Sequence, residues 1–321
     1  MYSGQSLSLN LLDNGLVELV LNQQGQSVNT LNQLALNELT EVVALLQSSA
    51  ELKGMLITSA KPSFVVGADI SEFREHFARS EAQLKGWIME THQLFSALEE
   101  LPFPTVTAVN GMALGGGFEL ALTTDFRVAA DDSRVGLPEV NLGICPGWGG
   151  TVRLSRLIGA QAALKWIVSG KPQRMDAALK LGAVDRVVAP DTLREAALEL
   201  LVEAVDGKVS YLDRREYKRQ PYAASVENRS ALADLVDQLM KKQDANYPAG
   251  GNMIDMVSGH LNMPFQQALE QEADCLAKLA RSDAATSLIG LFLNDQLLKK
   301  KARHWAKQTQ PVARSAVLGA G

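Results

Sequence analysis

The sequence predicts an α/β domain followed by an all-helical extension. Up to about residue 200, short apolar runs rich in β-branched residues alternate with longer runs whose apolar residues recur at helical spacing. Strands that alternate with helices in this way indicate a sheet with parallel pairing. From Asn228 onward the strand signals vanish and only helical patterns continue. At 321 residues, the chain is long enough to bury at least one sizeable core.

Local residue chemistry places the elements of the alternating part. Pro104 suits the start of a strand, and Asp69 stands where the N-cap of a helix is expected. The strands are expected at residues 15–21, 54–58, 104–109 and 126–130. The helices are expected at residues 36–46, 70–77, 84–98, 118–124, 160–169, 175–181 and 191–204.

The second part of the chain is expected to be helical and loop-like. Residues 213–221 are charged and poorly periodic, which favours a solvated linker over a basic contact patch. A loop is expected at residues 247–251, which contain proline and two glycines. The remaining periodic segments predict helices at residues 230–243, 264–280 and 283–306.

These patterns predict three successive units. The domain limits are residues 1–190 for the α/β domain, 191–310 for the helical extension and linker, and 311–321 for a final segment. In that final segment an apolar run enters Gly319-Ala320-Gly321, as at the first strand of a dinucleotide-binding domain. The third glycine and the helix that would hold a pyrophosphate are missing, so no hydride transfer is expected from this chain.

Composition and motif content exclude several functional classes. A net charge of −5 gives no global field that favours nucleic acid or acidic lipid. No run approaches a membrane span and the N-terminus lacks the features of a signal peptide, so a cytoplasmic protein is expected. The two cysteines exclude a disulfide scaffold, and the four histidines form no metal-binding pair, so no metal is expected. Serine-nucleophile and phosphate-loop motifs are lacking.

Three segments combine features that could build one catalytic site. Residues 64–70 bring an apolar run to Gly-Ala-Asp and then a helix, whose first N–H groups lack intrahelical partners. Residues 110–119 carry four glycines at a strand-to-helix turn, with Glu119 on the first turn of the helix. Residues 136–151 place a second carboxylate, Glu139, in a constrained loop.

Taken singly, each of these features is better explained by a structural role. Glu119 could complement its own helix dipole, Glu139 could be a surface residue, and glycine runs are often turns. Their co-occurrence favours function. The N–H groups would hold a carbonyl oxygen as it gains charge, and the carboxylates would move protons at the neighbouring carbons. This arrangement suits chemistry that passes through an enolate.

At these residues the sequence resembles the crotonase (enoyl-CoA hydratase/isomerase) family. The resemblance rests on the motifs at residues 66–70, 110–119 and 137–143, in this order and spacing, and covers roughly residues 10–200. Over its full length the chain is similar to the N-terminal part of bacterial multifunctional fatty-acid oxidation subunits, which join such a domain to a 3-hydroxyacyl-CoA dehydrogenase. The stretches at residues 289–296, 299–301 and 316–321 are similar to their linker and first dehydrogenase strand.

The resemblance implies a fold and specific residue roles. It implies a crotonase-like spiral of ββα units, with an oxyanion hole formed by the backbone N–H groups of Ala68 and Gly116. Glu119 and Glu139 would be the acid/base pair that adds water to C3 of a trans-2-enoyl-CoA and protonates C2. Glu139 is favoured as the residue that moves a proton between C2 and C4 in double-bond isomerisation. The residues implied to bind substrate are Val66, Gly67 and Asp295.

The resemblance also implies what the chain binds. Hydration would need no cofactor, acyl-CoA would be the substrate, and NAD would belong only to the dehydrogenase part. Thiolase (beta) subunits would be partners of the full-length protein. Asp295 lies on the apolar stripe of Leu288, Leu291 and Leu298, where a carboxylate is unusual and a functional role is open. A buried partnered acid or an exposed position is as well supported as substrate contact. Cys145 and Trp148 are expected to shape the acyl pocket.

Two other functions remain open at this point. One is a different crotonase-fold reaction, such as thioester hydrolysis, decarboxylation or dehalogenation. Members with those activities commonly lack one of the two glutamates, so the presence of both Glu119 and Glu139 argues against it. The other is a non-catalytic scaffold that docks thiolase subunits, for which both carboxylates would be dispensable.

Overall fold

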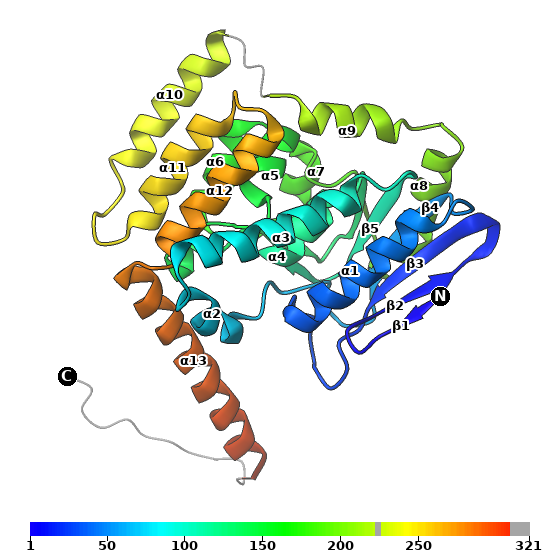
Figure 1. The fold of residues 1–321 in the computed structure, drawn as a ribbon, viewed down its shortest axis with the longest axis horizontal. Helices are drawn as coiled ribbons and strands as arrows, with labels where there is room; N and C mark the ends of the chain where they lie inside the picture. The colour runs from blue at the N-terminus through cyan, green and yellow to red at the C-terminus, as the bar shows by residue number, and fades with distance from the viewer. Residues whose placement is uncertain (222–225, 309–321) are drawn as a thin grey trace.

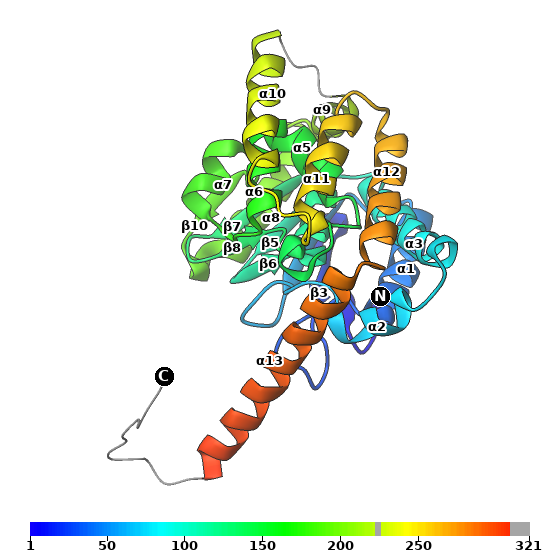
Figure 2. The same cartoon turned by 90° about the vertical axis from the view of Figure 1, so that its left-hand side faces the viewer.

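The computed structural model describes residues 1–221 and 226–308 (Figure 1). A mixed β-sheet lies at the centre of the N-terminal part, and helices pack on both of its faces. The C-terminal part is helical, and its last helix projects away from the body in both views (Figures 1 and 2). The predicted fold class is confirmed. Residues 311–321, where a further strand is expected, lie outside the described residues.

The main sheet has seven strands within the described residues, in the order β1-β2-β3-β4-β5-β7-β10. β1 and β2 are antiparallel to their neighbours, whereas β3, β4, β5, β7 and β10 run parallel, as the alternating pattern predicts. The expected strands correspond to β3, β4, β5 and β7. The bounds are β1 Tyr2–Ser3, β2 Leu7–Leu11, β3 Leu16–Leu21, β4 Gly54–Ser59, β5 Thr105–Val109, β7 Phe126–Ala130 and β10 Arg186–Val188.

A small second sheet turns the chain into a spiral. It consists of β6 (Met112–Leu114), β8 (Arg134–Gly136) and β9 (Gln173–Arg174), with β6 parallel to β8. Each of the units β5–β6–α4 and β7–β8–α5 contributes one strand to each sheet before its helix. These are the expected ββα units. The small-sheet strands have three residues or fewer, which is too short to leave a periodic signal.

Eight helices belong to the first 205 residues, all of them described. Asp69 caps α2 as expected, because its carboxylate accepts a 2.9 Å hydrogen bond from the N–H of Ser71. One helix, α5, is not predicted by the sequence, since its first turn lies in a glycine pair. The bounds are α1 Gln33–Ser48, α2 Ile70–Phe77, α3 Glu81–Glu99, α4 Gly116–Thr123, α5 Gly150–Ile158, α6 Ala160–Ser169, α7 Met175–Leu181 and α8 Leu193–Val205.

The two faces of the sheet are covered by different helices. Alternate residues of each strand point to opposite faces, so Met55 and Ile57 join the larger core while Leu56 joins a second one. This second core is closed by α8, whose apolar residues Leu193 and Leu200 pack against it. α8 therefore shares a core with the sheet although it lies beyond residue 190, and the domain limits stay a prediction.

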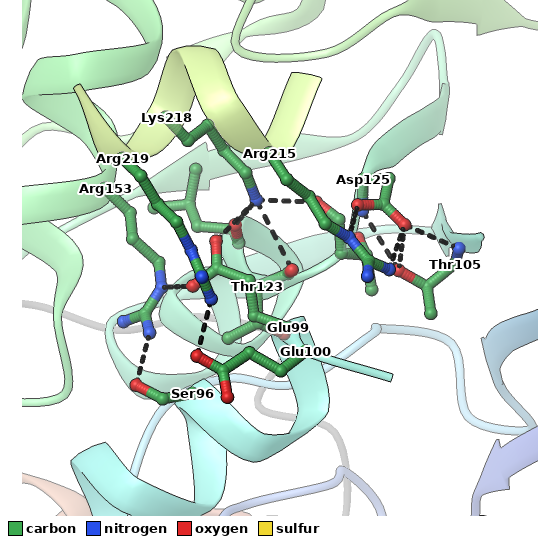
Figure 3. Close-up of polar contacts among 12 residues, drawn as sticks. Ser96, Glu99, Glu100, Thr105, Thr123, Asp125, Arg153, Arg215, Lys218 and Arg219 are labelled. Carbon is green, nitrogen blue, oxygen red and sulfur yellow. Dashed lines mark hydrogen bonds and ion pairs between the residues drawn. The ribbon is translucent and has the colours of Figure 1, made fainter. Parts of the chain in front are cut away.

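The charged stretch after α8 is a docked helix, so the expectation of a solvated linker is wrong. Residues Tyr211–Arg219 form α9. Lys218 is fully buried, where its ammonium donates to the carbonyl oxygens at the end of α4 and pairs with Glu99 at 2.8 Å. Arg215 pairs with buried Asp125 at 2.7 Å. Figure 3 shows these basic side chains pointing from α9 to acidic partners. The basic residues are thus internal anchors of α9.

Three of the remaining four helices form a layer against α3 and α6, and the last one contacts α2 and the turn at residues 139–142. The prediction of a loop at residues 247–251 is wrong, because a helix begins at Pro248. Its residues Met253, Ile254 and Val257 are buried. α12 packs against α3 and α11. No helix among residues 1–221 and 226–308 is long and apolar enough to cross a membrane. The bounds are α10 Val226–Met240, α11 Pro248–His260, α12 Phe265–Leu279 and α13 Asp283–Gln308.

Candidate active site

One pocket gathers most of the predicted site residues. Much of its wall is apolar and includes the rings of Phe73, Trp87 and Trp148. The structure brings together six of the seven predicted site residues in its lining, which are Val66, Gly67, Ala68, Gly116, Glu119 and Glu139. Cys145 and Trp148, which are expected to shape the pocket, also line it.

Two backbone N–H groups face this pocket from different segments. Leu31 donates to the carbonyl of Gly67 at 2.9 Å and accepts from the N–H of Asp69 at 3.2 Å. Because consecutive residues of an extended segment point their N–H groups to opposite sides, the N–H of Ala68 points away from Leu31. Gly116 is the first residue of α4, where an N–H group has no intrahelical acceptor. A Cβ atom on Gly116 would lie 3.6 Å from the nitrogen of Ala68, so the two donors adjoin one space.

Glycine is required at two consecutive positions of this wall. Gly115 has a φ of +51°, and a Cβ atom there would lie 2.7 Å from Oε1 of Glu139. A Cβ atom on Gly116 would overlap the ring of Trp148. The glycine run therefore lets the backbone approach both a carboxylate and an aromatic ring closely.

Glu119 is held in place by the loop that precedes α5. Its side chain is buried, and Oε1 accepts hydrogen bonds of 2.8 Å from the N–H groups of both Trp148 and Gly150. Burial raises the pKa of Glu119 well above its ordinary value, and the charges of Glu139 and Glu272 raise it further. The two N–H donors oppose this rise. One oxygen is thus fixed by the backbone while the other is available to the pocket.

Glu139 is the less restrained of the two predicted carboxylates. It begins a short 3₁₀ turn, Glu139–Leu142, directly after Pro138. Its Oε2 atom is buried and has no hydrogen-bond partner among the described residues. Burial raises the pKa of Glu139 to about 8, with a further contribution from the charge of Glu272. Burial thus favours the protonated form of Glu139.

Asp295 does not join the pocket. It lies on the projecting part of α13, where its exposed carboxylate forms an ion pair of 2.6 Å with Lys299 one helical turn later. The described residues bring no other predicted site residue near it, and its contact with substrate stays a prediction.

Sequence reasoning missed Glu272, a third buried carboxylate beside the pocket. It lies on α12 and is fully buried, and burial raises its pKa to about 7. A signal for it exists in the sequence, because Glu272 interrupts the apolar stripe of Leu269, Ala273 and Leu276. Asp295 has the same signal, so an acid on an apolar stripe does not by itself tell a buried residue beside the pocket from an exposed one.

Comparison with known proteins agrees with this geometry. The chain matches the enoyl-CoA hydratase/isomerase family over residues 13–253. It is 45% identical to the fatty acid oxidation complex subunit alpha of Pseudomonas syringae pv. syringae and 44% identical to that of Pseudomonas putida. Each of these alignments covers 100% of this chain and 45% of the relative. The chain therefore spans a little under half the length of the curated relatives that it matches.

Solved structures give the same result at lower identity. An enoyl-CoA hydratase from Bacillus anthracis is 30% identical with a TM-score of 0.59, over 75% of this chain and 93% of that protein. An enoyl-CoA hydratase/isomerase from Xanthobacter autotrophicus Py2 has a TM-score of 0.65 over 97% of this chain and 100% of its own. Its identity is 21%, so this second likeness concerns the fold alone.

Proposed function

The chain belongs to the enoyl-CoA hydratase/isomerase family, and on that premise we propose that it hydrates a trans-2-enoyl-CoA to a 3-hydroxyacyl-CoA in fatty-acid oxidation. The observation that carries the proposal is the composition of the pocket. Two carboxylates, Glu119 and Glu139, and two backbone N–H groups, those of Ala68 and Gly116, adjoin one apolar cavity. These are the groups that an enolate reaction on a thioester needs.

The N–H groups of Ala68 and Gly116 would bind the thioester oxygen. As water adds to C3, negative charge moves through the conjugated system onto this oxygen, and fixed donors stabilise it there. Loss of a single donor of this kind costs about 2.7–4 kcal/mol in other enzymes, which makes the oxyanion hole a large contributor to the rate. Val66 and Gly67, in the same lining, would position the acyl group.

The two carboxylates would share one proton, because two buried like charges resist ionising together. We assign the ionised form to Glu119, whose Oε1 accepts two N–H groups, and the proton to Glu139, whose buried Oε2 accepts no hydrogen bond from the described residues. Glu119 would take a proton from water as the water oxygen bonds to C3. Glu139 would then give its proton to C2 of the enolate, and transfer of a proton from Glu119 back to Glu139 would restore the pair.

Double-bond isomerisation is a second candidate activity of the same pocket. It requires one group that removes a proton at one carbon and returns it at another. Glu139 suits this role in its ionised form, with the shared proton of the pair on Glu119, since its Oε2 atom has no hydrogen-bond partner among the described residues. Glu139 would move the proton between C4 and C2 while the oxyanion hole holds the dienolate.

Partners and location are finer proposals. The curated relatives are named as subunits of a complex, which supports a partner subunit. We assign that role to thiolase (beta) subunits and place the activity in the cytoplasm. Hydration needs no cofactor, and NAD would be bound by the dehydrogenase part of such longer proteins. Contact of Asp295 with substrate also belongs to these proposals.

The function is tested by following loss of the enoyl-thioester absorbance of crotonyl-CoA and of a longer trans-2-enoyl-CoA. The wild-type chain should hydrate at least one of them. Glu139→Gln should slow hydration by about 10²–10⁴-fold with acyl-CoA binding retained, because it loses the acid. Glu90→Gln, on the exposed side of α3, is the matched control and should keep the wild-type rate. Full activity in both Glu119→Gln and Glu139→Gln would overturn the proposal and favour a docking scaffold.

A further inference from the structure

The loop before α5 is held by two carboxylates in alternation. The four consecutive N–H groups of Trp148 to Thr151 point alternately to opposite sides of the loop. Those of Trp148 and Gly150 donate to Oε1 of Glu119, at 2.8 Å each. Those of Gly149 and Thr151 donate to the two oxygens of Glu272, at 2.6 and 2.9 Å. The loop is thus fixed between α4, which carries Glu119, and α12, which carries Glu272.

Glu272 is itself closely surrounded by polar groups. The hydroxyl of Thr151 donates to its Oε2 atom, so that oxygen accepts from both the backbone and the side chain of one residue. His92 of α3 lies with Nε2 3.6 Å from Oε1 and 2.7 Å from the carbonyl of Gly147. His260 of α11 places Nε2 3.4 Å from the Thr151 hydroxyl, which must accept because its proton goes to Glu272. Helices α3, α5 and α11 therefore meet at this carboxylate of α12.

Glu272 cannot act on a substrate directly. It is fully buried and does not line the pocket. Its position matters because it binds the N–H groups of Gly149 and Thr151, which alternate along the loop with the N–H groups of Trp148 and Gly150 that bind Glu119. Loss of the contacts to Glu272 would therefore loosen the backbone that carries the N–H groups of Trp148 and Gly150.

We propose that Glu272 is a positioning residue for the proposed hydration, which fixes the backbone at Gly149 and Thr151 so that the adjacent amides orient Glu119. The catalytic part of this inference rests on the proposed function, whereas the restraint of the loop does not. α12 thereby completes the active site from a segment more than 100 residues after the loop.

The charge of Glu272 also acts on the acid/base pair. It is among the causes that raise the pKa of Glu119 and that of Glu139. When Glu272 is neutral, both pKa values fall, because a nearby like charge has been removed. The titratable and charged groups that face Glu272 are His92 of α3, Glu119 of α4, Glu139, Cys145, Arg153 of α5 and, through Thr151, His260 of α11.

Glu272→Gln separates these effects with little change of volume. The amide oxygen of glutamine can still accept from Gly149, but its NH₂ group would face the N–H of Thr151, a second donor. The loop should therefore lose one restraint. We expect kcat for hydration to fall by about 10- to 100-fold, as when a catalytic group loses its orienting partner, with KM nearly unchanged. The control is Glu270→Gln, an exposed glutamate of the same helix, which should behave as wild type.

The dependence of kcat/KM on pH distinguishes positioning from a merely structural role. Because Glu272→Gln removes a like charge, both limbs of the bell-shaped profile should move to lower pH. A variant that only reduced the amount of folded enzyme would lose rate with an unshifted profile. Either that result, or a wild-type kcat and profile in Glu272→Gln, would overturn the proposal.

Hydrogen–deuterium exchange of the amides of residues 148–151 tests the restraint without any activity. Exchange should be faster in Glu272→Gln than in wild type and in Glu270→Gln, and equal exchange in all three would overturn the proposal. If Glu272→Gln does not fold, Thr151→Val removes only the hydroxyl donor and should speed exchange in the same loop, whereas unchanged exchange would overturn it. If the wild-type chain hydrates no enoyl-CoA, the proposed function fails. The exchange measurement still shows whether Glu272 restrains the loop.

Discussion

The buried carboxylates around Glu99 and those around Glu119 differ in their partners. Glu99 is fully buried, which alone would raise its pKa, but Lys218 and Arg153 bring it down to about 2. Glu119 is equally buried, and burial together with the charge of Glu139 raises its pKa well above the ordinary value. Two equally buried glutamates thus have pKa values shifted in opposite directions.

The difference shows what separates a structural acid from a candidate catalytic one. In the Glu99 cluster each carboxylate oxygen pairs with a cation, at 2.8 Å for Lys218 and 3.1 Å for Arg153 (Figure 3). In the pocket, Glu119 accepts only neutral N–H groups. A carboxylate held this way can exchange a proton near neutral pH, whereas one locked between two cations cannot.

The largest effect on stability is expected from Lys218→Met. It leaves Glu99 with one cation fewer in the interior and removes the donor from the carbonyl groups at the end of α4. Removing one partner of a buried ion pair costs about 3–5 kcal/mol, so the free energy of unfolding in urea should fall by that amount. Arg219→Met is the control, because its pair with Glu100 is exposed and contributes about 0–1 kcal/mol. Equal losses in the two variants would remove the distinction between paired and solvated charges.

A smaller loss of stability with a large loss of rate is expected from Gly116→Ala. The added methyl group would overlap the Trp148 ring, and such overpacking costs about 1–3 kcal/mol. Displacing the oxyanion donor by an ångström should slow hydration by about 10²-fold. Gly86→Ala is the matched control, since a Cβ atom there meets open space and alanine favours the helix by about 0.5–1 kcal/mol. A fully active Gly116→Ala enzyme would contradict the assignment of this N–H group.

The dependence of stability on pH should separate the two clusters. Glu139 has a pKa of about 8 in the folded protein against an ordinary value of 4.5, so the folded state holds a proton that the unfolded state releases. Its contribution to stability is lost as pH rises from about 4.5 to about 8. Glu99, with a pKa of about 2, contributes stability that is lost as pH falls from about 4.5 to about 2. In urea unfolding, Glu139→Gln should reduce the loss of stability at rising pH, to which Glu119 and Glu272 also contribute. Glu99→Gln should remove the loss at falling pH, and wild-type slopes in both variants would contradict the distinction.

The smallest effect on stability is expected from Asp295→Asn. Its ion pair with Lys299 is exposed on both sides and spans one helical turn. Such pairs contribute about 0.3–0.5 kcal/mol, so thermal unfolding should change little. A loss of more than about 2 kcal/mol in the free energy of unfolding would mean that Asp295 stabilises the fold as a buried ion pair does, like Glu99.

Much of the candidate site could be predicted because its residues lie in compact segments. The turn at Asp69 and the glycine run before Glu119 place backbone N–H groups by local geometry alone, and the structure brings both to the pocket. Glu272 could not be placed in this way. Its role depends on α12 packing across α3, a contact between parts of the chain far apart in sequence.

Two helices were missed for a different physical reason. α9 is rich in charge, and its residues Arg215 and Lys218 turn inward because they pair with the buried acids Asp125 and Glu99, which lie elsewhere in the fold. α11 contains glycines that lower its intrinsic helix propensity, but burial of residues such as Ile254 outweighs this preference. In both cases tertiary packing overrides the local pattern.

The most direct test of the account is the hydration rate of Glu119→Gln, measured on protein whose free energy of unfolding is known. The amide oxygen of glutamine can still accept from Trp148 and Gly150, so the free energy of unfolding should change by no more than about 1 kcal/mol, the size typical of a single substitution. The account predicts that hydration nevertheless falls by about 10²–10⁴-fold, because the proton acceptor is gone. A wild-type hydration rate in this stable variant would contradict the claim that Glu119 is one of the two catalytic carboxylates.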